Sequence, residues 1–108
     1  MLGAIDINIE ITDRIAIRTV NGNCGLNGRV TELVKWDENH KYCWSLAMWE
    51  FNSKEHEFEL DLIGDRIFND IDSDEIEKVW RFSKIVTKML NEYANIAYYE
   101  EDGNYLYD

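Results

Sequence analysis

The first residues of the chain alternate between apolar and polar positions. Isoleucine occupies every second position from Ile5 to Ile11, with polar residues between. A period of two with β-branched residues on one side is typical of a strand with one buried face. After a polar break at Asp13 and Arg14 the alternation resumes over residues 15–19, so the sequence predicts two strands joined as a hairpin.

A segment rich in glycine and asparagine, residues 21–28, follows. Both residue types favour left-handed turn conformations, which predicts a connecting loop. Its spacing matches neither the P-loop nor the dinucleotide fingerprint, both of which open a helix, whereas residues 30–36 read as a third strand. Phosphate binding is therefore not expected at this loop.

A long fourth strand is predicted over residues 41–51, after a polar loop at residues 37–40. Both of its faces are apolar, which favours a central strand or one covered on both sides. Alternation assigns one face to Tyr42, Trp44, Leu46 and Met48, and the other to Cys43, Ala47, Trp49 and Phe51.

A fifth strand follows a turn at residues 52–54. Its apolar residues alternate with acids, so its outer face is predicted to be a ladder of carboxylates about 7 Å apart. The buried members are Phe58, Leu60 and Leu62, and the outward acids are Glu57, Glu59 and Asp61.

A long helix is predicted next. Asp72 and Glu75 match a capping box, and Ser73 is an equally good cap one residue later. Apolar residues then recur at three- and four-residue spacing, which predicts a helix packed on one face of the sheet. This stripe consists of Ile76, Val79, Trp80, Ser83, Val86, Leu90 and Ala94.

The C-terminal residues carry a turn signal. Asp102-Gly103 lies between alternating aromatic residues, which favours a β-ribbon formed by residues 98–101 and 104–107, with a frayed acidic tail as the alternative. The length of 108 residues fits one domain over residues 1–108. The predicted fold class is α+β, an antiparallel sheet of about five strands with one long helix packed on one face.

Charge is distributed unevenly along the chain. Residues 1–35 hold four acids and four bases, while residues 36–108 hold eighteen acids and seven bases, which accounts for the net charge of −11. A field of this sign repels nucleic acid and membrane phosphates and attracts basic protein surfaces. The candidate partner-binding residues are the acids Glu55, Glu57, Glu59, Asp61, Asp65, Asp70, Asp72, Asp74 and Glu75.

Compartment and redox state follow from what the sequence lacks. No stretch approaches the roughly 20 apolar residues that span a bilayer, and the N-terminus lacks a secretory signal pattern, so a cytoplasmic location is expected. Cys24 and Cys43 are accordingly predicted to be free thiols.

The remaining chemistry-bearing residues fit ordinary structural roles better than catalytic or metal sites. The soft ligands Cys24, His40, Cys43 and His56 lack the two paired clusters of a zinc site, so no metal and no cofactor are expected. The acids near Asp70, Asp72 and Asp74 lack the glycine and distal glutamate of a calcium loop. A Cys–His nucleophile needs a spatial pairing that a sequence does not reveal. Glycosidase-like catalysis needs two acids inside a cleft, which regular spacing on an outer face does not favour.

One part of the chain resembles a known group of proteins. The run from Tyr42 to Trp49, together with residues 58–60 and 62–66, resembles small uncharacterised proteins of bacteriophages and prophages, and the resemblance covers residues 42–68. It implies a context rather than a site, because small acidic phage proteins are often inhibitors of host machinery, including nucleic-acid-binding defence enzymes.

Charge and context together lead to a functional hypothesis. We expect a non-enzymatic inhibitor of the anti-CRISPR or anti-restriction type, acting in the host cytoplasm, whose carboxylates imitate a nucleic-acid backbone. Its partner would be a basic nucleic-acid-binding protein of the host, with no direct contact to nucleic acid or membrane. The alternative is a small homodimeric structural or regulatory interaction module whose acidity is incidental, and a hydrolase using the acidic cluster ranks third.

Overall fold

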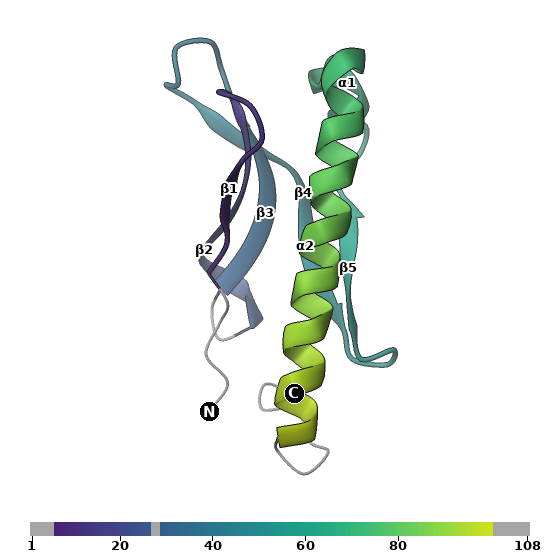
Figure 1. Cartoon of the computed structure of the whole chain (residues 1–108). Coiled ribbons are helices and arrows are strands. Elements are labelled where there is room, and N and C mark those ends of the chain that lie inside the picture. Colours follow the sequence, from purple (N-terminus) through teal and green to yellow (C-terminus); the bar gives the residue numbers. More distant parts are fainter. Residues whose placement is uncertain (1–5, 27–28, 101–108) are drawn as a thin grey trace.

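The computed structural model describes residues 6–26 and 29–100 and confirms the α+β class. The chain forms a five-stranded antiparallel sheet in the order β1-β2-β3-β4-β5, with a long helix along one face (Figure 1). The elements are β1 (Asn8–Glu10), β2 (Ile15–Leu26), β3 (Arg29–Trp36), β4 (Cys43–Asn52), β5 (Glu57–Leu62), α1 (Arg66–Asp70) and α2 (Ser73–Glu100). Neither described helix is long and apolar enough to cross a membrane.

The predicted N-terminal hairpin is present. β1 pairs antiparallel with β2, and the turn between them is held by Thr12, whose Oγ1 accepts hydrogen bonds from the backbone N–H groups of Arg14 and Ile15. Ile7 and Ile11 lie in the core whereas Asn8 and Glu10 are exposed, as the alternation predicts.

The core lies between the sheet and α2. One row of paired residues crosses four strands, from Ile17 through Leu33 and Ala47 to Leu62. The first three have no exposed surface, and neither do Val79 and Val86 of the facing helix. Burial of each Val, Leu or Ile side chain stabilises the fold by about 1.5–3 kcal/mol. The contact with α2 therefore determines which side of the sheet is buried and which side faces solvent.

Polar contacts set the position of α2 along the strands. The Trp49 Nε1–H donates to Thr87 Oγ1 at 2.8 Å, and the Phe58 N–H donates to Asn91 Oδ1 at 2.6 Å. The second bond satisfies a backbone group of β5 from the helix. Together they explain why Thr87 and Asn91, beside the apolar stripe, face the sheet.

The predicted faces of β4 are wrong in part, because the strand contains a β-bulge. Leu33 pairs with Ala47 but Val34 pairs with Ser45, so Leu46 is an extra residue. An extra residue reverses the alternation. Trp44 and Leu46 therefore join Trp49 in the core region, and only the central position of β4 in the sheet is confirmed.

Two other local predictions need correction, and one short element was not predicted. The Gly/Asn-rich segment was expected to be a loop, but β2 continues to Leu26, with an irregular register in which both Asn21 and Leu26 pair with Arg29. The short helix α1 was not predicted; Gly64, at φ +52°, turns the chain into it after β5. α2 extends to Glu100, so residues 98–100 are helical where a ribbon was expected, and residues 101–108 lie outside the described part.

Candidate functional site

The predicted carboxylate ladder lies on the face of β5 that points away from α2. Glu57, Glu59 and Asp61 are exposed, whereas Phe58 between them is 8% exposed and packs in the core. A strand rises about 3.3 Å per residue, so neighbouring acids of the ladder start about 7 Å apart. The alternation of the sequence is therefore preserved in the structure.

β4 extends this ladder by one carboxylate. Glu50 is exposed and lies directly opposite Glu59 in the antiparallel register. Glu50 was not among the acids predicted from the sequence. Residues two apart on a strand lie on the same face, so Glu50 could have been assigned to the face of Met48. We call Glu50, Glu57, Glu59 and Asp61 the acidic face. Within the described residues, none of the four lies within ion-pair distance of a basic side chain; Glu59 accepts a hydrogen bond from Asn52 Nδ2 at 3.1 Å.

The remaining predicted acids lie in different surroundings. Glu55 is exposed in the turn between β4 and β5, and Asp65 is exposed just before α1. Asp70 is half-buried, and its carboxylate accepts a 2.8 Å hydrogen bond from Trp44 Nε1. Asp70 thus holds the end of α1 against β4, and its carboxylate is less exposed to a partner than those of the ladder. Arg66, the one base between Glu55 and Glu77, donates to the Ser45 carbonyl.

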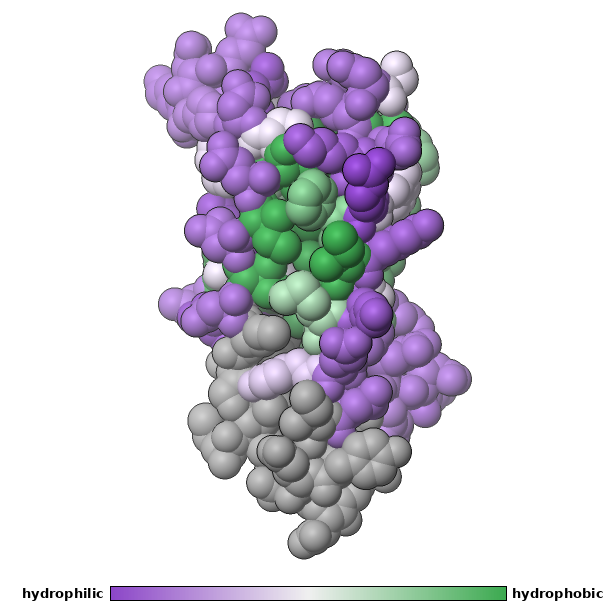
Figure 2. All heavy atoms as spheres, viewed as in Figure 1, coloured by the Kyte–Doolittle hydropathy of each residue, from purple (hydrophilic) through white to green (hydrophobic). Residues whose placement is uncertain are grey.

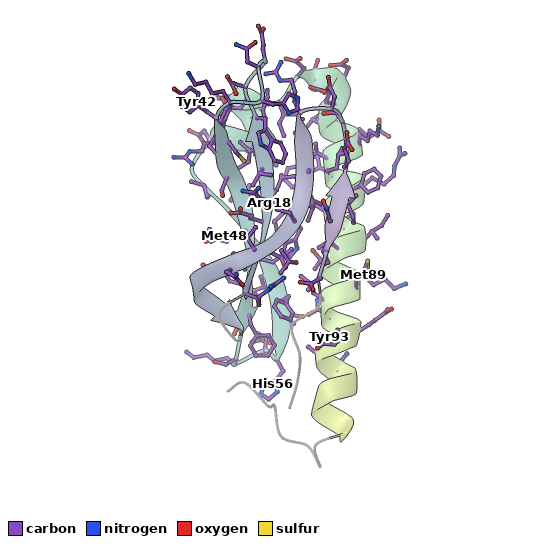
Figure 3. All side chains as sticks on the ribbon, turned by 90° about the vertical axis from the view of Figure 1, so that its left-hand side faces the viewer. Arg18, Tyr42, Met48, His56, Met89 and Tyr93 are labelled. Carbon is purple, nitrogen blue, oxygen red and sulfur yellow. The ribbon has the colours of Figure 1, made fainter. Side chains whose placement is uncertain are left out.

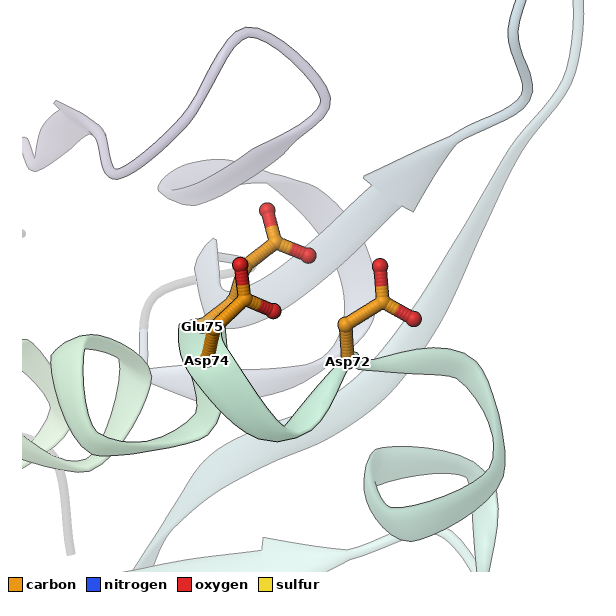
Figure 4. Close-up of side chains that lie close together, drawn as sticks. All are labelled: Asp72, Asp74 and Glu75. Carbon is orange, nitrogen blue, oxygen red and sulfur yellow. The ribbon is translucent and has the colours of Figure 1, made fainter.

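Three acids gather where α2 begins. One oxygen from each of Asp72, Asp74 and Glu75 lies within 4.8 Å of the others (Figure 4). Carboxylate oxygens are ligands for hard divalent ions, but the positive end of the helix dipole stabilises acids here without any ion. The cluster excludes Asp70, which sequence reasoning had grouped with Asp72 and Asp74. The helix dipole therefore accounts for the position of these acids without a bound ion.

The histidines and the described cysteine do not assemble into a site. His40 precedes β4 and His56 follows it, so they lie near opposite ends of that strand, as Tyr42 and His56 do in Figure 3. Both histidines have positive φ angles in turns, 55° and 56°. Cys43 is a free thiol, as predicted, while the side chain of Cys24 lies outside the described part.

The outer face also holds an open pocket of about 470 Å³ near β1. Trp36 lines it, with the Arg18 guanidinium 5.4 Å from the centre of its ring. Its cationic side chains already have partners, since Arg18 pairs with Glu32 and Arg29 with Asp6. The pocket is therefore built from paired charges, and it does not contain the acidic face.

Comparison with known proteins finds no matching family model, and no curated protein or solved structure that matches significantly.

Proposed function

We propose that this protein is a non-enzymatic inhibitor that places its acidic face on the basic nucleic-acid-binding surface of another protein. One observation carries the proposal: four exposed carboxylates share one face of β4 and β5 without a cationic partner among the described residues. Unpaired like charges repel one another within the fold. A partner's lysines and arginines would relieve that repulsion and gain charge-assisted contacts.

The spacing limits how closely the face imitates DNA. A DNA strand carries one phosphate per about 3.4 Å of helix axis, whereas the ladder carries one carboxylate per about 7 Å. From Glu57 to Asp61 the row is about 13 Å long. The face therefore matches a short basic groove that reads a few phosphates. Glu55, in the turn next to β5, extends the charge at one end.

The position of the acids favours binding over catalysis. General acid–base chemistry needs carboxyl groups in a cleft with displaced pKa values, and the acidic face is open to solvent on a flat strand. The resemblance of residues 42–68 to small phage and prophage proteins gives the setting. In that setting the partner is a host defence protein, of the CRISPR-effector or restriction-enzyme kind.

The proposal is tested with two variants of equal charge. The first neutralises the ladder (Glu57→Gln, Glu59→Gln, Asp61→Asn), and the second neutralises three exposed acids elsewhere (Glu10→Gln, Asp13→Asn, Glu38→Gln). Each loses three of the net −11 charges and reaches −8.

The wild type and both variants are immobilised and exposed to nuclease-treated bacterial lysate, and captured proteins are identified by mass spectrometry. We expect the wild type and the second variant to capture the same nucleic-acid-binding protein. Added duplex DNA should release this protein, and the ladder variant should fail to capture it. Equal capture by both variants would contradict the proposal and favour an interaction module whose acidity only solubilises it.

A further inference from the structure

α2 carries a second apolar line that the sheet does not cover. Ile85 and Met89 are 47% and 38% exposed, while their neighbours Val86 and Leu90 are 0% and 2% exposed in the core. Phe82, one turn earlier, is half-buried at the edge of the core. Figure 2 shows apolar surface along α2 and toward the β1 side of the molecule. A contiguous exposed apolar patch is a candidate interaction surface.

The apolar line continues into charges of opposite sign at its two ends. Lys78, Phe82, Ile85, Met89 and Glu92 are separated by four, three, four and three residues, so they lie along one side of the helix. We call these five residues the α2 stripe. Ile85 is its centre, because Lys78 and Glu92 are each seven residues away, about 10.5 Å along the axis.

This arrangement is complementary to itself. If a second α2 runs antiparallel to the first and the two-fold axis passes through Ile85, each Lys78 lies opposite Glu92 of the other copy. The apolar residues then meet at the centre, as in an antiparallel coiled coil. Within the described residues Lys78 has no ion-pair partner in its own chain, and Glu92 has only an exposed contact with Lys88 at 3.9 Å.

Local charge opposes this contact less than it would elsewhere on the molecule. Residues 77–92 hold four bases and two acids, a net of +2, although the whole chain carries −11. A second copy that approaches α2 thus avoids the acidic face, which points away on the other side of the sheet. We propose that the protein forms a symmetric homodimer through the α2 stripe, with Lys78 of each copy paired to Glu92 of the other.

The size of the surface sets the expected strength. Three apolar residues per copy make a contact smaller than the roughly 1,200–2,000 Å² of standard stable interfaces, so the dissociation constant should be about 10–100 µM. Both acidic faces remain free in such a dimer. Dimerisation through α2 therefore does not depend on the proposed inhibitor function.

The first experiment is sedimentation velocity of the full chain from about 1 µM to about 300 µM, a range that brackets this affinity. We expect a monomer–dimer equilibrium that Ile85→Glu abolishes with little effect on the melting temperature, because the side chain is exposed. Lys84→Glu is the control: it reverses an exposed charge on the same helix outside the stripe. A monomer at all concentrations, or a dimer that survives Ile85→Glu, would overturn the proposal.

A charge-exchange experiment tests the antiparallel register. Lys78→Glu and Glu92→Lys each place like charges opposite each other twice per dimer, so each variant alone should dimerise about tenfold more weakly. A mixture of the two variants restores opposite charges at both contacts, and heterodimers should form with nearly wild-type affinity. A mixture that associates no better than its components would show that the helices do not pair in this way.

Discussion

Glu59 lies at the centre of the acidic face, and neutralising it should stabilise the fold. Its neighbours are Glu57 and Asp61 along β5 and Glu50 directly across on β4. Like charges opposite one another on adjacent strands are destabilising. Gln at position 59 keeps an oxygen that can accept the hydrogen bond from Asn52 Nδ2, so Glu59→Gln removes the charge and little else.

The size of the effect follows from Coulomb's law. Two unit charges in water interact by about 0.6 kcal/mol at about 7 Å, the spacing along β5, and by about 0.8 kcal/mol at about 5 Å, the spacing across to Glu50, so the three neighbours together give about 2 kcal/mol. Because exposed side chains splay apart and attract counterions, we expect Glu59→Gln to raise the free energy of unfolding by about 0.5–1 kcal/mol at low salt. At 1 M salt, with a screening length of about 3 Å, the gain should nearly vanish.

Urea unfolding at about 0.01 M and about 1 M salt measures this difference. Glu10→Gln is the matched control, since Glu10 is exposed on the opposite edge strand and pairs with Ala16 rather than with an acid. The control should change stability little at either salt concentration. A loss of stability in Glu59→Gln, or a gain that persists at high salt, would refute the view that the acidic face stores uncompensated repulsion.

Other predictions concern the core and two titrating groups. Ile7→Asp buries an unpaired charge and should lower the free energy of unfolding by several kcal/mol in urea melts. Asn8→Asp should change it little, because Asn8 is exposed opposite Arg18. Equal effects of the two variants would contradict the assignment of Ile7 to the buried face of the sheet. Hydrogen bonds from the backbone N–H groups of Tyr42 and Lys41 lower the pKa of Asp37 below 3.8. The ionised Asp37 therefore stabilises the fold above that pH, and this stabilisation is lost as the pH falls through the lowered pKa. A carboxyl NMR titration that finds an ordinary or raised pKa for Asp37 would contradict this. Partial burial raises the pKa of the Cys43 thiol. In a Cys24→Ser background, the reaction of Cys43 with a thiol reagent should therefore reach half its maximal rate at a higher pH in folded than in unfolded protein. Identical pH–rate profiles for the folded and unfolded protein would contradict this.

The fold was predictable wherever the pattern was local and regular. Strict alternation identified β1, β2 and β5, and spacing of three and four residues identified the buried side of α2, because one buried face requires those periods. The faces of β4 were not predictable, since Leu46 is one apolar residue among many and nothing in the sequence marks it as a bulge. Its position depends on the pairing with Leu33 and Val34.

The candidate site was predictable as a ladder but not as a surface. Glu57, Glu59 and Asp61 follow from alternation alone. Glu50 joins them only through the register between β4 and β5, and the hydrogen bond from Trp44 to Asp70 links residues 26 positions apart in the sequence, which no local pattern predicts. The α2 stripe was not predicted, because Phe82, Ile85 and Met89 recur at the same three- and four-residue spacing as the buried residues beside them.

The most direct test of the inhibitor proposal uses the purified protein with its captured partner. The measurement is the partner's affinity for its own nucleic acid as this protein is added, followed by fluorescence anisotropy. Mutually exclusive binding predicts that the partner's apparent dissociation constant for nucleic acid rises linearly with the concentration of this protein. The ladder variant should lack this effect, and the equally charged control variant should retain it. A ternary complex in which the partner holds nucleic acid and this protein at once, with undiminished affinity for both, would contradict the claim that the acidic face occupies the nucleic-acid site.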